Sequence, residues 1–164
     1  MRHYLAALVT FLTFAVAPAN AGIVDSPLPV LSAGEKTHHV FSVPGIVIGA
    51  YGMDSFFNCT SLDKVPIRIG VELFRSNGTV HNDVTATSVT LAPGATVIFA
   101  TSPAASFAPV VDLDVTVWAS GSARILATST KFGCTAFMAD SANLPPTSMV
   151  SLTIIAKSKQ KAAN

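Results

Sequence analysis

The sequence contains few charged residues. Only 12% of its residues are Asp, Glu, Lys or Arg, whereas an ordinary globular domain has about 25%. Half of the residues are apolar, unlike those of a disordered chain, which is polar and highly charged. We therefore expect a folded domain whose surface consists mainly of Ser, Thr, Ala and Asn side chains.

Neither sign of charge dominates. The chain has 10 Lys and Arg residues against 9 Asp and Glu, which gives a net charge of +1. Removal of Arg2 with the leader described below would leave the two signs equal. Sequence-independent binding to nucleic acid rests on a strong positive field, so we expect no nucleic-acid partner.

The motifs of common enzyme classes are also missing. The chain contains no Gly-x-Ser-x-Gly, no phosphate-binding loop and no Gly-rich dinucleotide fingerprint. Ser and Thr are abundant, but no neighbouring base activates them, and Thr suits the exposed face of a strand. These absences favour a non-enzymatic protein without a cofactor.

Cysteine occurs only twice, as Cys59 and Cys134. There is no Cys-x-x-Cys spacing, which disfavours a redox pair, and two ligands are too few for a zinc site. In an oxidising compartment an even pair of cysteines usually forms a disulfide. We predict a Cys59–Cys134 disulfide that joins two strands across the core; two separate reduced thiols are the alternative.

The N-terminus carries the features of an export signal. Arg2 and His3 precede an apolar run from Leu5 to Val16, and Ala19-Asn20-Ala21 supplies a small-residue cleavage site. The run is shorter than the roughly 20 residues that span a bilayer. We predict a signal peptide over residues 1–21, cleaved after Ala21, and a secreted or periplasmic protein without a transmembrane segment. Cleavage after Ala19, an uncleaved anchor and an N-terminal core helix are the alternatives.

Alternating apolar residues predict strands throughout, and no segment has a helical period. From Val65 to Phe74, odd-numbered residues should face the core and even-numbered ones water. Asn77-Gly78 is typical of a hairpin and Pro93-Gly94 of a tight turn. We expect strands at 37–43, 46–51, 54–59, 65–74, 84–91, 95–101, 111–118, two within 121–139, and 149–156.

This spacing predicts an all-β fold, a single antiparallel β-sandwich of about 8–10 strands. The sandwich should occupy residues 37–157, between an extended N-terminal arm at 22–36 and a polar tail at 158–164. No internal repeat or second domain is evident in the sequence.

Several short motifs suggest a family. A Phe-x-Cys strand ending at Cys59, a strand followed by Asn-Gly and the turn Leu-Ala-Pro-Gly occur in that order, before Gly-Ser-Ala-Arg-Ile at 121–125 and Cys-Thr-Ala at 134–136. Together they resemble exported bacterial immunoglobulin-like β-sandwich proteins of no assigned function. The resemblance implies an immunoglobulin-like fold and no catalytic residues. The position of Trp118, opposite the aliphatic face of its strand, departs from the core Trp of that pattern.

One strand face is a candidate binding surface. In the expected strand 111–118, the even-numbered residues Asp112, Asp114, Thr116 and Trp118 share a face. A Trp beside carboxylates and hydroxyls suits sugar stacking or protein docking. Two aspartates could also bind calcium if Asp54 or Asp83 joined them. Solvated aspartates and a Trp packed under a loop are the alternatives.

The histidines predict no metal site. His38 and His39 are adjacent, so on a strand they point to opposite faces, and a shared metal would require His81 to lie close by. The sequons at Asn58 and Asn77 matter only in a eukaryotic host, where Asn77 is the better acceptor.

We therefore expect an exported, non-enzymatic β-sandwich module that binds or assembles with an envelope or extracellular partner, an unknown protein or glycan. A structural surface-assembly subunit is the alternative, and a metal-binding protein or small hydrolase is a remote one.

Overall fold

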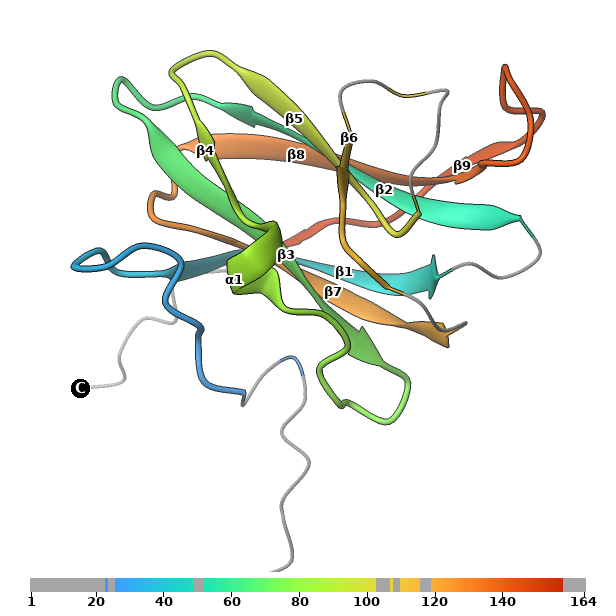
Figure 1. Ribbon diagram of the computed structural model, residues 1–164, viewed down its shortest axis with the longest axis horizontal. Helices are drawn as coiled ribbons and strands as arrows, with labels where there is room; N and C mark the ends of the chain where they lie inside the picture. Colours follow the sequence, from blue (N-terminus) through green and yellow to red (C-terminus); the bar gives the residue numbers. More distant parts are fainter. Residues whose placement is uncertain are drawn as a thin grey trace, which may run out of the picture.

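A computed structural model describes residues 23, 26–48, 52–102, 107, 110–115 and 119–157. Two five-stranded sheets lie face to face and are not closed into a barrel (Figure 1). Sheet A has the order β10 (Ile155–Ala156), β1 (His38–Ile48), β7 (Ala119–Ala127), β3 (Ile67–Arg75), β4 (Val89–Leu91). Sheet B has the order β6 (Val110–Asp112), β5 (Thr96–Ala100), β2 (Met53–Ser61), β8 (Phe132–Asp140), β9 (Met149–Ser151).

The predicted all-β, sandwich-like architecture is thus confirmed, with one correction. Neighbouring strands are antiparallel except for β5 and β6, which pair in parallel. The expected leader at 1–21 and the polar tail at 158–164 lie outside the described residues. In the part of the chain that is described, no helix is long and apolar enough to cross a membrane.

The core lies between the two sheets, where the alternation of β3 places it. Ile67, Ile69, Val71 and Leu73 are buried and pack in the main core cluster, as the pattern predicts. Val65, which the same pattern assigns to the core face, precedes β3 and is exposed. Phe57 and Phe99 of sheet B belong to the same cluster. Burying side chains of this size stabilises a fold by about 1.5–3 kcal/mol each.

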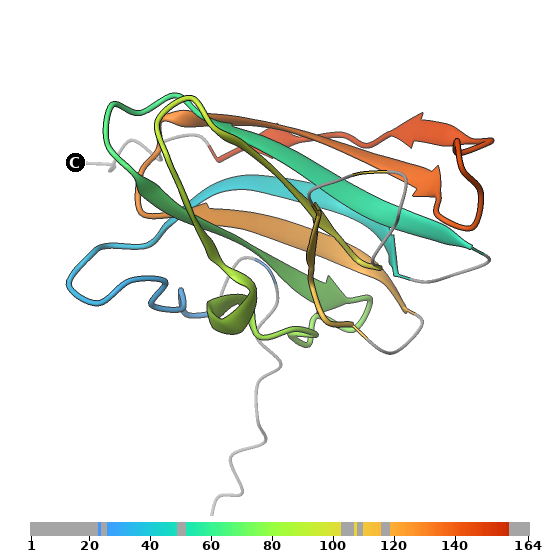
Figure 2. The same ribbon diagram turned by 45° about the horizontal axis from the view of Figure 1, so that its top comes forward.

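The other face of β3 is buried as well, contrary to the prediction that it faces water. Gly70, Glu72 and Phe74 are all buried. Figure 2 shows why: the N-terminal segment and the helix α1 (Val84–Thr87) lie against sheet A on the side away from sheet B. The sequence pattern cannot reveal this cover, because it comes from segments outside the strand.

The helix α1 replaces the first half of a strand expected at 84–91, which survives only as β4. Asp83 causes the change: its Oδ1 accepts hydrogen bonds from the backbone N–H groups of Thr85 and Ala86 and caps the helix. Val84 then packs so closely on β3 that a Cβ at Gly70 would lie 2.7 Å from its Cγ2. The local capping interaction therefore overrides the alternating pattern.

Two other strand boundaries differ from the prediction. Pro44-Gly45 was expected to end a strand, but β1 continues through it with a register shift between Pro44 and Ile46, and Gly45 has φ of +73°. The C-terminal strand instead divides between the sheets as β9 and β10. Alternation in 149–156 would bury all the even-numbered residues from Val150 to Ala156. Leu152 and Ile154 do pack on the core, whereas Val150 and Ala156 are exposed.

The predicted disulfide forms, but its position is different. Cys59 and Cys134 are bonded and are direct partners in the β2–β8 register, with Cα atoms 4.1 Å apart. The bond therefore joins neighbouring strands within sheet B and does not cross the core. Both cysteines pack with the core cluster beside Phe132 and Ala136. Sequence patterns place the two cysteines on core faces but do not show that their strands are neighbours.

Candidate functional site

The predicted binding face is only partly described. β6 ends at Asp112, and Asp114 follows with φ of +52°, its backbone N–H donating to Asp112 Oδ1 over 3.0 Å. The strict alternation expected for 111–118 therefore does not extend to Asp114, although both carboxylates are exposed. Thr116 and Trp118 lie outside the described residues, so the face as a whole stays a prediction.

The carboxylates proposed to complete a calcium site have other partners. Asp83 caps α1, and Asp54 is buried where Thr101 Oγ1 and Ser141 Oγ donate to it. Among the described residues, no group of three or more His, Cys, Asp or Glu is placed to hold a metal ion.

The histidines have separate environments. His39 Nε2 lies 2.9 Å from Ser42 Oγ, and His81 Nδ1 accepts from Arg75 Nε over 2.8 Å. Burial, with the positive charges of Lys157 and Arg124 as smaller contributions, lowers the pKa of His39 to about 4. His39 is therefore neutral at physiological pH.

The most unusual group in the described structure is a buried ion pair on the outer face of sheet A. Arg124 of β7 and Glu72 of β3 are register partners, and Arg124 Nε donates to Glu72 Oε2. Their side chains are 1% and 7% exposed. The guanidinium carbon also lies 5.1 Å from the centre of the Phe74 ring. Such a pair needs further hydrogen bonds to offset the loss of hydration.

The N-terminal segment supplies these bonds. Arg124 Nη1 donates to the carbonyl of Ser26 over 3.0 Å, and Nη2 donates to that of Pro27 over 2.9 Å. Further along, Leu31 is buried in a small cluster with Val84 of α1 and Leu126 of β7. We call residues 26–31 the docked segment. The Arg124 side chain thus holds the N-terminal segment on the sheet by binding the backbone carbonyls of that segment.

A groove opens beside this ion pair. Ser122 lies two residues from Arg124 on β7, on the same outer face, and is the register partner of Pro44 on β1 and of Phe74 on β3. The groove has a volume of about 590 Å³, within the range of about 300–1,000 Å³ typical of ligand pockets. Ile23 lies against it, so the N-terminal segment forms part of its wall.

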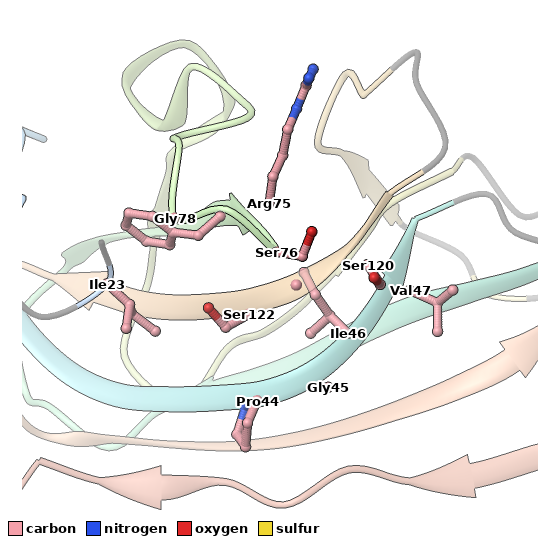
Figure 3. A pocket seen from close by; sticks show the side chains of 12 residues that line it. Ile23, Pro44, Gly45, Ile46, Val47, Arg75, Ser76, Gly78, Ser120 and Ser122 are labelled. Carbon is pink, nitrogen blue, oxygen red and sulfur yellow. The ribbon is translucent and has the colours of Figure 1, made fainter. Parts of the chain in front are cut away.

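Small residues keep the groove open. Its sides carry the hydroxyls of Ser76, Ser120 and Ser122, while Arg75 stands at the rim and extends away from the strands (Figure 3). At Gly121 a Cβ would lie 1.8 Å from the carbonyl oxygen of Phe74, so only glycine permits this approach of β7 to β3. A lining that combines apolar side chains with a few polar groups is typical of binding sites.

The groove offers hydrogen-bonding side chains, the hydroxyls of its serines. None of its described lining residues is Asp, Glu, His, Cys or Lys, so none of these described residues can act as a general base toward a serine. The single cation of that lining, Arg75, has no carboxylate within ion-pair distance among the described residues. The serine hydroxyls can both donate and accept hydrogen bonds, whereas Arg75 Nε already donates to His81 Nδ1.

The sequence alone predicted neither the buried ion pair nor the groove beside it. Phe74 and Gly70 on the same strand face as Glu72 were a usable signal, because an aromatic side chain and a glycine are unusual on a solvated face. The opposite charges of Glu72 and Arg124 were visible too, but their pairing depends on the β3–β7 register.

The comparisons with known proteins gave no match, whether with family models, curated proteins or solved structures.

Proposed function

We propose that this chain is an exported, non-enzymatic β-sandwich module of the immunoglobulin-like kind that binds an envelope or extracellular partner. The observation that carries the proposal is the groove on the outer face of sheet A, with three serine hydroxyls, one cation and no general base among its described lining residues. The disulfide supports export, because disulfides persist in oxidising compartments.

The groove's chemistry suits a hydroxyl- or carboxylate-bearing surface, such as a glycan or an acidic protein segment. Serine hydroxyls donate and accept hydrogen bonds, and Arg75 adds a charge-assisted donor. The candidate face at Asp112 and Asp114 carries the opposite charge, so the two surfaces would select different ligands.

Equilibrium binding to a panel of glycans, cell-wall fragments and purified envelope proteins tests the proposal. Ser120→Trp fills the groove from an exposed position, and Thr90→Trp on β4 is the matched control. We expect saturable binding that falls at least about tenfold with Ser120→Trp, a loss of about 1.4 kcal/mol, and is unchanged with Thr90→Trp. Equal effects of the two changes would show that the ligand does not bind in the groove. Turnover of a ligand that depends on one side chain would contradict a non-enzymatic role.

A further inference from the structure

Another hollow lies on the outer face of sheet B, on the opposite side of the sandwich from the groove. It lies over the neighbouring strands β2 and β8 (Figure 1). Its volume is about 320 Å³, at the lower end of the range of about 300–1,000 Å³ typical of ligand pockets. We call it the sheet B hollow, and its described lining residues are Asn58, Thr60, Gly133, Cys134 and Thr135.

Position 133 keeps the hollow open. Gly133 of β8 is the register partner of Thr60 on β2 and contributes no side chain to the outer face. A Cβ at Gly133 would meet one described atom within 4 Å, Leu62 Cδ1 at 3.9 Å. No described neighbour therefore requires glycine here, in contrast to Gly121. A glycine inside a strand weakens the strand and often marks a place where a ligand approaches the backbone.

The hollow contains a buried acceptor that lacks a donor. Asn58 Oδ1 is buried and has no hydrogen-bond donor among the described residues. The hydroxyl of Thr60, by contrast, lies 2.8 Å from Thr96 Oγ1 and so has a partner within the sheet. Burying an acceptor without a donor costs stability. A ligand that donates a hydrogen bond to Asn58 Oδ1 would remove that cost.

The surroundings of the hollow define the chemistry of the ligand. None of its described lining residues carries a charge. Phe137, which is partly exposed, lies two residues beyond Thr135 on the same face of β8. The exposed Leu62 lies beside Gly133. Amide and hydroxyl groups are thus flanked by apolar surface on both sides, which matches a sugar ring with hydroxyls at its edge and C–H groups on its faces.

We propose that the sheet B hollow binds a neutral sugar unit. One sugar hydroxyl donates to Asn58 Oδ1, another bonds the hydroxyl of Thr135, and the apolar face of the ring extends toward Phe137. The binding energy includes the relief of the unpaired acceptor. This inference does not depend on the groove having a ligand, because the two sites lie on opposite sheets.

NMR titration of the isotope-labelled full chain with glucose, galactose, mannose and N-acetylglucosamine tests the proposal. At least one of these sugars should shift the side-chain amide of Asn58 and the backbone amides of 133–135 saturably, with a dissociation constant of about 10 mM or tighter. The amides of 120–122 in the groove should not follow the same curve. No saturable shift with any of the four sugars, or shifts confined to other residues, would overturn the proposal.

Glucuronic acid tests whether the ligand is neutral. It adds a carboxylate to the glucose framework, and no described residue lining the hollow supplies a cation to pair with it. Glucuronic acid should therefore bind no tighter than glucose. Tighter binding would contradict a site for neutral sugars.

Gly133→Val places a side chain in the hollow. Valine suits a strand, and the space above Gly133 accepts it without a clash. We expect the affinity for the sugar to fall at least about tenfold. Thr90→Val, which puts the same residue on exposed β4 of sheet A, and Ser120→Trp in the groove should leave it unchanged. Unchanged affinity in folded Gly133→Val would overturn the site, and an equal loss in Ser120→Trp would assign the binding to the groove.

Asn58→Leu separates binding from a structural role. Leucine is close in size to asparagine and removes the unpaired oxygen, so the urea midpoint of unfolding should not fall. The affinity for the sugar should fall at least about tenfold. A lower midpoint with unchanged affinity would mean that the amide is structural and would overturn the proposal. Because this variant keeps Gly133, it decides the question if Gly133→Val fails to fold.

Discussion

The outer faces of the two sheets are covered in chemically different ways. On sheet A, the docked segment is fixed by the Glu72–Arg124 ion pair. On sheet B, aromatic rings form the cover. The ring centre of Phe56 lies 5.2 Å from that of Phe137 and 4.7 Å from that of Phe107. Ala100 and Ala139 are buried with them.

The two covers differ in how precisely they fix the position of the segment that lies on the sheet. Ring packing depends mainly on buried area and tolerates changes of partner. A buried guanidinium has five donors in a fixed geometry and loses much of its hydration, so it requires acceptors at defined positions. The carbonyls of Ser26 and Pro27 meet that requirement. The ion pair therefore specifies where the N-terminal segment lies, whereas the aromatic cluster specifies only that the face is covered.

The largest effect should come from breaking the ion pair. Arg124→Met leaves Glu72 buried without its partner, and we expect a loss of about 3–5 kcal/mol in the free energy of unfolding, measured in urea. Lys131→Met removes an exposed lysine from its pair with Asp63 and should cost less than about 1 kcal/mol. Combining Arg124→Met with Glu72→Leu should recover much of the loss. A double variant as unstable as Arg124→Met would contradict the role of unpaired charge.

A smaller effect should follow on sheet B. Phe56→Leu keeps an apolar side chain in the cluster but removes one ring from both aromatic contacts. We expect a loss of about 1–2 kcal/mol in the free energy of unfolding, since most of the buried area stays. A loss as large as that of Arg124→Met would mean that the aromatic face is as specific as the charged one.

A third effect should appear as a dependence on pH. The pKa of His39 is lowered to about 4 from an ordinary value near 6.5, so between these values the unfolded chain binds a proton that the folded chain does not. Stability should therefore fall as pH falls from about 6.5 to 4, and His39 should add no further slope above or below this window. His39→Gln should remove part of the slope in urea titrations, and His38→Gln is the control. An unchanged slope in His39→Gln would contradict this assignment.

The strands could be predicted from the sequence where only the face toward the opposite sheet is buried. The inward residues of β3 and the turn at Pro93-Gly94 follow from alternation and turn chemistry, and the structure confirms both. The expectation failed where a distant segment covers an outer face, as at Glu72, or where a side chain competes with the strand, as at Asp83. Both failures depend on contacts that periodicity within one segment does not contain.

The candidate site was less predictable than the fold. The groove is made by β1, β7 and β3, which are separated in sequence and adjacent only in sheet A. The pairing of Cys59 with Cys134 was predictable from their number, but their placement within one sheet required the strand order. The candidate site therefore arises from topology and not from a local motif.

Hydrogen exchange at the amide of Leu31 tests most directly the claim that Arg124 holds the N-terminal segment. This amide donates to Thr37 Oγ1, and its protection requires the turn that holds Leu31 against Val84 and Leu126. In Arg124→Met, without denaturant and at a pH where the variant is folded, Leu31 should lose its protection, whereas the amides of β2 and β8 keep theirs. Full protection of Leu31 in the folded variant would contradict the account.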